Sequence, residues 1–217
     1  MVKVYFISGM AADRRVFRHI QLPTGFEAIY LDWITPQKKE SLPSYAMRMA
    51  TNIDTTEPFA LVGLSFGGML ATEIAKQFQP VATILISSVP VSSHLPGYFR
   101  IAAKMNLHKI VPISLLKSSA AAKRFFTTER SDDKKLLWQI INESDTGLIR
   151  WSMHAILNWQ NDTIPQPVCH IHGTRDEVLP IRYTQPTHTI DKAGHMLVMT
   201  RPGEVNEILS NVLAYVK

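Results

Sequence analysis

The sequence predicts an α/β fold, a mostly parallel sheet of about six strands flanked by helices and carrying a helical cap insertion. Three observations predict it. Short apolar stretches alternate with amphipathic ones through residues 1–90, which is typical of parallel strands joined by helices. Residues 91–165 then lack a convincing strand and show helical patterns instead, and the alternation resumes over residues 166–217. We therefore expect a core that is interrupted once, by a helical cap.

The position of each element follows from the hydrophobic pattern. Stretches rich in β-branched and aromatic residues are expected to be strands, at residues 2–8, 26–31, 59–64, 81–86, 168–172 and 187–190. Amphipathic periodicity predicts core helices at residues 14–20, 42–53, 69–76 and 205–216. Similar patterns predict cap helices at residues 98–107, 120–126, 132–141 and 148–159. Ser41 and Ser131 are suitable N-caps for the helices that follow them.

The composition is that of a globular domain. With 217 residues, 46% of them hydrophobic and 19% charged, the chain is large enough to bury one substantial core. No apolar stretch is long enough to span a membrane, and residues 1–8 are interpreted as a first strand rather than a signal peptide. The single cysteine, Cys169, cannot form an internal disulfide, and its place in an apolar stretch indicates a buried thiol. We therefore expect a cytoplasmic location.

The formal net charge of +5 raises the question of a nucleic-acid partner. The basic residues are scattered in short clusters without a recognition motif, so we expect a solvated basic surface and no nucleic acid. His170 and His172 lie in a predicted strand, where we expect them to hydrogen-bond to neighbours. No carboxylate cluster near them completes a metal site, and we expect neither a metal nor a cofactor. A small-molecule substrate is the expected partner, and the oligomeric state is left open.

The stretch Gly63-Leu64-Ser65-Phe66-Gly67 lies where a buried strand is expected to turn sharply into a helix. A serine at such a turn adopts a strained backbone conformation, and bulky side chains two positions away would clash with it. Gly63 and Gly67 remove that clash, and Gly68 allows the helix to lie close to the sheet. The Ser65 hydroxyl is therefore expected at the carboxyl end of the strand. A pentapeptide of this kind carries little weight by itself, so the interpretation depends on its partners.

A serine nucleophile needs a base and an orienting acid within hydrogen-bond reach. Asp176 follows one of the resumed strands by a few residues, and His195 follows the next strand. Glu177 and Asp191 are alternatives for the acid. We expect Glu177 to face solvent and Asp191 to support the loop before the histidine, which favours Asp176.

Three short motifs at strand ends follow one another along the chain: Gly63-Leu64-Ser65-Phe66-Gly67-Gly68, His172-Gly173-x-x-Asp176 and Gly194-His195. In these motifs and their order the sequence resembles the α/β-hydrolase superfamily, in its compact, single-cap form. The resemblance implies that Ser65 is the nucleophile, His195 the general base and Asp176 the orienting acid. Some members carry the acid after the preceding strand, but residues 87–90 of this chain contain no carboxylate.

The resemblance also implies an oxyanion hole made of two backbone N–H groups. One is Phe66 N–H, directly after the nucleophile, and the other is Met10 N–H on the loop after the first strand. Where the family often has His-Gly before this residue, the chain has Ser8-Gly9. The serine leaves the backbone donor in place but changes what steadies the loop.

The implied function is that of a carboxylesterase-like serine hydrolase, which cleaves a small, fairly apolar ester or related acyl compound through an acyl-enzyme. The alternatives are thioesterase, amidase or C–C lyase chemistry on the same fold, and a small-ligand-binding protein with vestigial catalysis. Aromatic side chains in and before the cap are expected mainly in the core, with a few facing the substrate. The candidates for the pocket are Trp33, Tyr98, Phe125, Trp138 and Trp151.

Overall fold

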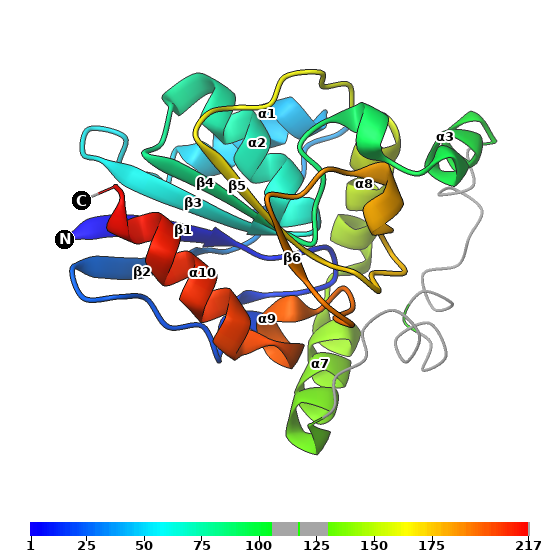
Figure 1. Cartoon of the computed structure of the whole chain (residues 1–217). Coiled ribbons are helices and arrows are strands. Elements are labelled where there is room, and N and C mark those ends of the chain that lie inside the picture. The colour runs from blue at the N-terminus through cyan, green and yellow to red at the C-terminus, as the bar shows by residue number, and fades with distance from the viewer. Residues whose placement is uncertain (106–116, 118–129, 217) are drawn as a thin grey trace.

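The computed structural model of the protein describes residues 1–105, 117 and 130–216. Its centre is one six-stranded sheet in the order β2-β1-β3-β4-β5-β6, in which every neighbouring pair is parallel (Figure 1). The strands are β1 (Val2–Ile7), β2 (Phe26–Leu31), β3 (Phe59–Leu64), β4 (Ala82–Ile86), β5 (Val168–Gly173) and β6 (His188–Ile190). The predicted α/β class with a parallel six-stranded sheet is confirmed.

Helices cover both faces of this sheet (Figure 1). The core helices are α1 (Leu42–Ala50), α2 (Phe66–Phe78), α9 (Leu197–Thr200) and α10 (Pro202–Ala214). The described part of residues 91–165 contributes α3 (Gly97–Lys104), α7 (Ser131–Glu143) and α8 (Thr146–Leu157). Short 3-10 turns are η1 (Arg14–Phe17), η2 (Ser92–His94) and η3 (Ile181–Tyr183).

The alternation of side chains along each strand produces two separate cores. In β1, Tyr5 and Ile7 belong to one core, while Val4 and Phe6 belong to the other. The first core lies against α1, α2 and α8, and the second lies against α7, α9 and α10. Because both faces of the sheet are buried, its strands appear in the sequence as continuous apolar stretches.

Several core elements begin or end differently from the expectation. The segment expected as a helix at residues 14–20 forms only the turn η1, whose N-cap Asp13 accepts a hydrogen bond from Arg15 N at 2.9 Å. Helix α2 begins directly after Ser65, earlier than its apolar periodicity suggested. The short helix α9 was not expected. Ser41 is confirmed as the N-cap of α1 and accepts from Ser44 N at 3.3 Å.

Helix α7 also begins at a different residue from the one expected. The N-cap of α7 is Arg130, and Ser131 is already helical without a side-chain hydrogen bond at the cap. The prediction that Ser131 caps this helix is therefore wrong. Asp145 caps α8, because its carboxylate accepts from Leu148 N at 2.7 Å. The helix expected at residues 120–126 lies outside the described residues.

Buried tryptophans in and after α8 connect this helix to the segments around α1 and α2. Trp151 Nε1 donates to Glu40 O at 2.9 Å, and Trp159 Nε1 donates to Glu73 Oε1 at 2.8 Å. Both rings are buried in the same core as α1 and α2. Helix α8 consequently lies beside the carboxyl ends of the strands, the edge where parallel sheets place their binding sites (Figure 1).

Candidate active site

Ser65 occupies the sharp turn between β3 and α2. Its φ of 53° and ψ of −119° are a strained conformation for a residue with a side chain. Ser65 N donates to Ile86 O at 2.9 Å, and Ser65 O accepts from Gly68 N at 2.9 Å. The Ser88 hydroxyl also donates to Ser65 O, at 2.7 Å. The end of β4 and the residues after it therefore hold the turn through both of its backbone polar groups.

Three glycines allow this turn to lie against the sheet. A Cβ atom at Gly67 would collide with the backbone carbonyl of Ile7 at the end of β1. A Cβ atom at Gly68 would collide with the Ser88 hydroxyl, and one at Gly63 would collide with the backbone of the two following glycines. Because there is no room for a side chain at these positions, α2 can begin in direct contact with the strands.

His195 lies between Ser65 and Asp176 and reaches both. Its Nε2 atom is 2.9 Å from Ser65 Oγ, and its Nδ1 atom is 2.7 Å from Asp176 Oδ2. The other carboxylate oxygen, Oδ1, accepts from the N–H groups of Val178 and Leu179 at 2.8 and 2.9 Å. Asp176 and His195 are each 4% exposed. The structure thus brings the three residues singled out in the sequence into one hydrogen-bonded line.

The charge of Asp176 determines where the hydrogens of this line lie. Burial opposes ionisation, but the His195 ring and hydrogen bonds from His172 and His195 more than offset it, and the pKa of Asp176 is lowered. An ionised carboxylate can only accept hydrogen bonds, so His195 Nδ1 carries a hydrogen. In the neutral ring, the lone pair of Nε2 is then directed at the Ser65 hydroxyl. A general base requires this arrangement.

The two alternative acids differ from the buried Asp176 in their exposure. Both Glu177 and Asp191 are exposed. Thr174 Oγ1 donates to Asp191 Oδ1 at 3.2 Å and accepts from Lys192 N at 2.8 Å. As expected, Asp191 therefore supports the loop that precedes the histidine.

Two further histidines continue the line behind Asp176, which the sequence alone did not reveal. His172 Nε2 is 2.7 Å from Leu179 O and 3.3 Å from Asp176 Oδ2. His170 Nε2 is 3.1 Å from His172 Nδ1. The two rings are 0% and 3% exposed. The only available signal was that residues 170 and 172 share one face of β5, while His172 stands four residues before the acid.

The loop after β1 lies directly beside Ser65. A Cβ atom at Gly9 would be only 3.2 Å from the Cβ of Ser65. The buried Ser8 hydroxyl donates to Ala12 O at 3.0 Å, and Ala12 N donates to Gly9 O at 3.1 Å. Ser8 therefore steadies the loop that carries Met10. On the other side, Phe66 is the first residue of α2, so its N–H has no carbonyl four residues earlier in the helix.

Two of the expected pocket residues contact Phe66. Trp33 stacks on the Phe66 ring with centroids 5.7 Å apart and an interplanar angle of 13°. Trp151 meets the same ring edge-on at 5.7 Å and 67°. Trp33 Nε1 also donates to Ala12 O at 2.8 Å, so this ring connects the residue after Ser65 with the loop after β1.

The other expected pocket residues are placed differently. Tyr98 is 48% exposed, and its hydroxyl donates to Val178 O at 3.1 Å on the loop that carries the acid. Trp138 is 39% exposed on α7. Phe125 lies outside the described residues. A contact of these side chains with substrate stays a prediction.

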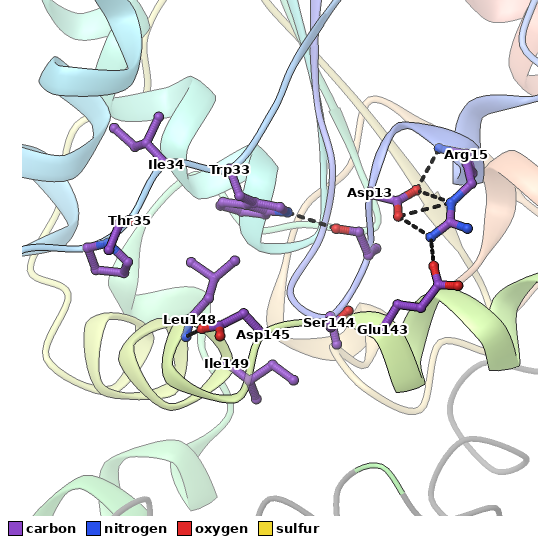
Figure 2. A pocket seen from close by; sticks show the side chains of 13 residues that line it. Asp13, Arg15, Trp33, Ile34, Thr35, Glu143, Ser144, Asp145, Leu148 and Ile149 are labelled. Atoms are coloured by element: carbon purple, nitrogen blue, oxygen red, sulfur yellow. Dashed lines mark hydrogen bonds and ion pairs between the residues drawn. The ribbon is translucent and has the colours of Figure 1, made fainter.

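A cavity of about 430 Å³ lies next to the loop after β1, enclosed by the loop after β2 and the junction of α7 and α8 (Figure 2). On its charged side, Arg15 lies between Asp13 and Glu143, with 2.6 Å to a carboxylate oxygen of each. The apolar lining consists of Ala11, Ala12, Trp33, Ile34, Pro36, Leu148 and Ile149. Ser65 does not line this cavity, which adjoins the site through Trp33.

The described residues contain neither a candidate membrane span nor a metal-binding cluster. None of the helices within residues 1–105 and 130–216 is long and apolar enough to cross a bilayer. Over the same part of the chain, His, Cys, Asp and Glu side chains form no group of three or more that could hold a metal ion. Cys169 is buried, as predicted, and burial raises the pKa of its thiol.

Comparison with known proteins identifies the family of the chain. The model of the alpha/beta hydrolase family matches residues 6–208. Uncharacterised proteins of Mycobacterium tuberculosis and Mycobacterium bovis are each 24% identical over 180 residues, which cover 70% of this chain. The chain spans only about half, 53%, of the length of these curated relatives.

Solved structures with the same fold include enzymes. A thermophilic esterase from Thermogutta terrifontis aligns with a TM-score of 0.78 and 16% identity over 100% of this chain and 90% of its own. MenH from S. aureus aligns with a TM-score of 0.76 and 15% identity over 99% and 94%. An esterase from Exiguobacterium antarcticum aligns with a TM-score of 0.74 and 14% identity over 100% and 92%. At these identities the likeness shows the fold.

Proposed function

Because the chain belongs to the alpha/beta hydrolase family, we propose that it is a carboxylesterase-like serine hydrolase. Ser65 is the nucleophile, His195 the general base and Asp176 the orienting acid. One observation carries the proposal, namely the continuous line of hydrogen bonds of 2.7 and 2.9 Å from the acid through the base to the serine. A protein that only binds a ligand has no need of these three groups in this order.

The geometry supports acyl transfer through a covalent intermediate. Ser65 Oγ attacks the carbonyl carbon of the substrate while His195 Nε2 takes its proton, and Asp176 stabilises the imidazolium that forms. The N–H groups of Met10 and Phe66 donate to the carbonyl oxygen as it becomes negative. His195 then gives the proton to the leaving group, and the acyl group stays on the serine. Water, deprotonated by the same histidine, releases the acid and restores the free serine.

The proposed substrate is a small, fairly apolar ester or a related acyl compound. Support comes from the stacked Trp33 ring and from the apolar lining of the adjacent cavity, which would accept the non-reacting part of the substrate. The Asp13–Arg15–Glu143 group lies on another side of the cavity and limits the length of an apolar chain that fits there.

Replacing the nucleophile tests the proposed function. Ser65→Ala is expected to abolish the hydrolysis of short-chain p-nitrophenyl esters and the covalent labelling by a fluorophosphonate, because both reactions need the serine oxygen. Circular dichroism and thermal unfolding report whether the fold survives. Ser93→Ala, the same change at an exposed serine in η2, is the matched control and should keep both activities.

The outcomes separate the proposal from its alternatives. Ester turnover by Ser65→Ala at the wild-type rate would refute the proposal. Labelling of the wild type at Ser65 without ester turnover would direct the search to another acyl substrate, for which a panel of thioesters and amides of graded chain length is suited.

A further inference from the structure

Two buried histidines stand behind the carboxylate of Asp176, and the proposed reaction gives neither a role. They lie on one face of β5, in the order His170, His172, Asp176 along the line of contacts. The last of these contacts, between His172 Nε2 and Asp176 Oδ2, is 3.3 Å long. The same carboxylate oxygen accepts from His195 Nδ1 at 2.7 Å. One oxygen of the acid is therefore shared by two imidazole rings.

The hydrogens on these rings follow from their partners. Leu179 O, 2.7 Å from His172 Nε2, is a carbonyl oxygen and can only accept, so His172 Nε2 carries a hydrogen. This hydrogen also points toward Asp176 Oδ2. In a neutral His172 the Nδ1 atom is then a bare acceptor, and the hydrogen in the 3.1 Å contact must belong to His170 Nε2. The carbonyl oxygen of Leu179 therefore fixes the tautomer of His172, and His172 in turn fixes that of His170.

The surroundings of His170 favour its neutral form. Burial, and secondarily the adjacent His172, lowers the pKa of His170 to about 3. Its Nδ1 atom is buried and has no hydrogen-bond partner among the described residues. A bare ring nitrogen tolerates this position better than an N–H group without an acceptor. A backbone contact with Ser88 acts against burial but is too weak to offset it, and Nδ1 makes no hydrogen bond of regular geometry, so the well-formed bond of His170 is the one it donates to His172.

We propose that His172 is a positioning residue for Asp176 and that His170 keeps it in the neutral Nε2–H form. This inference rests on the proposed function, in which Asp176 orients His195. A protonated His172 would form a second ion pair with Asp176 and compete with His195 for its charge. With His172 neutral, it supplies one hydrogen bond to the acid, and the full negative charge serves the His195 imidazolium.

Other ionisable groups around this line come from several elements. The groups around it include His195 on the loop before α9, His94 in η2 and Tyr98 on α3, and Tyr98 in turn interacts with Arg182 and Tyr183 of η3. Burial lowers the pKa of His94, and Tyr98 contacts the acid's loop through its bond to Val178 O. The carboxylate of this line is that of Asp176.

The effect of His172 can be measured through the reactivity of Ser65. In His172→Phe the acid loses a hydrogen-bond donor, so its oxygen attracts the Nδ1 hydrogen of His195 more strongly and stabilises the imidazolium form of that ring. The acidic limb of the rate of fluorophosphonate labelling, followed by intact mass against pH, should therefore move to higher pH. The maximal rate should fall about tenfold, because the acid is held less firmly. His172→Gln places an N–H donor where Nε2 lies and should restore the wild-type limb.

For a second variant we expect the acidic limb of the labelling rate to move in the opposite direction. His170→Phe removes the donor to His172 Nδ1, so that His172 can take a proton beside Asp176. The resulting cation competes with the His195 imidazolium for the charge of Asp176, so the acidic limb should move to lower pH. This variant also serves if His172→Phe does not fold.

The outcomes distinguish the inference from the proposed function. If the wild type is not labelled at Ser65, the proposed function itself is refuted. If the wild type is labelled, but the acidic limb stays in place in the folded variants and only their thermal stability falls, the histidines are structural and the inference is overturned. The inference would also be contradicted if the acidic limb of the labelling rate moved as far in His172→Gln as in His172→Phe.

Discussion

Asp176 and His170 are both buried and ionisable, yet one is expected to be charged and the other neutral. For the carboxylate, the cost of burial is offset by the His195 ring and by hydrogen bonds, and the pKa is lowered. For His170 the neighbouring His172 adds to the cost of burial, a backbone contact with Ser88 offsets only part of it, and the pKa is lowered from 6.5 to about 3. One residue is thus expected to stay charged and the other neutral around neutral pH, although both lie in the same part of the core.

The neutral His170 should make the protein sensitive to mild acid. In the unfolded chain this side chain takes up a proton near pH 6.5, whereas in the folded protein it does so only near pH 3. Between these values the unfolded state binds more protons, so the free energy of unfolding decreases as the pH falls. His170→Phe should therefore lose less stability than the wild type between about pH 7 and about pH 4. Urea unfolding at a series of pH values measures this difference.

An exposed histidine on the neighbouring strand provides the control. His188→Gln, on β6, should keep the pH dependence of the wild type. Parallel curves for the wild type and His170→Phe would show that burial of this histidine does not govern the acid sensitivity.

Helix α2 and strand β1 lie so close together that only glycine fits at the point of contact. The first turn of α2 passes over the carbonyl groups at the end of β1, and no Cβ atom fits at Gly67. The same approach brings the loop that carries Met10 next to Ser65. Close packing of these two elements therefore has a functional consequence as well as a structural one.

Gly67→Ala should separate α2 from β1. The added methyl group meets backbone carbonyls that cannot move independently, and such overpacking typically costs about 1–3 kcal/mol of stability. Urea unfolding should show this loss, and fluorophosphonate labelling should become slower because Ser65 shifts with the helix.

Gly203→Ala is a matched control in another helix. A Cβ atom at this position in α10 meets nothing within 4 Å, so alanine should be neutral or stabilise the helix by up to about 1 kcal/mol. Equal losses in the two variants would attribute the effect to helical glycines in general rather than to the contact with β1.

At the scale of the whole molecule, the cavity beside Trp33 forms where core loops meet the insertion. Residues after β1 and β2 provide one wall, and the junction of α7 and α8 provides the other (Figure 2). The pair Arg15–Glu143 joins the two parts directly at 2.6 Å. The size of the cavity is therefore set by how the insertion packs on the core.

Filling this cavity should change the preference for chain length. Leu148→Trp adds bulk from α8 and should raise the KM for longer-chain p-nitrophenyl esters about tenfold, while an acetyl ester is hydrolysed as before. The comparison of KM across a series of chain lengths measures the effect. Leu157→Trp makes the same change on α8 at a half-buried position that does not line the cavity. Equal responses of both variants at every chain length would exclude the cavity as part of the substrate site.

The sequence predicted most of the sheet because burial on both faces leaves a local pattern. The stretch at residues 59–64, for example, is strand β3 without any shift of its ends. Local chemistry was less informative where packing decides the outcome. The turn η1 replaced an expected helix, and Ser131 became part of α7 rather than its cap. Both depend on neighbouring elements that no local pattern specifies.

The sequence by itself determined the order of strands and helices and the chemical groups available at the strand ends, including Ser65, Asp176 and His195. These features depend on periodicity and on short motifs, which act over a few residues. Only the tertiary structure decided that His172 shares the oxygen of Asp176, that Trp33 stacks on Phe66, and that a cavity forms beside them. These contacts join segments far apart in the chain, so they arise from the packing of whole elements and cannot be read from local pattern.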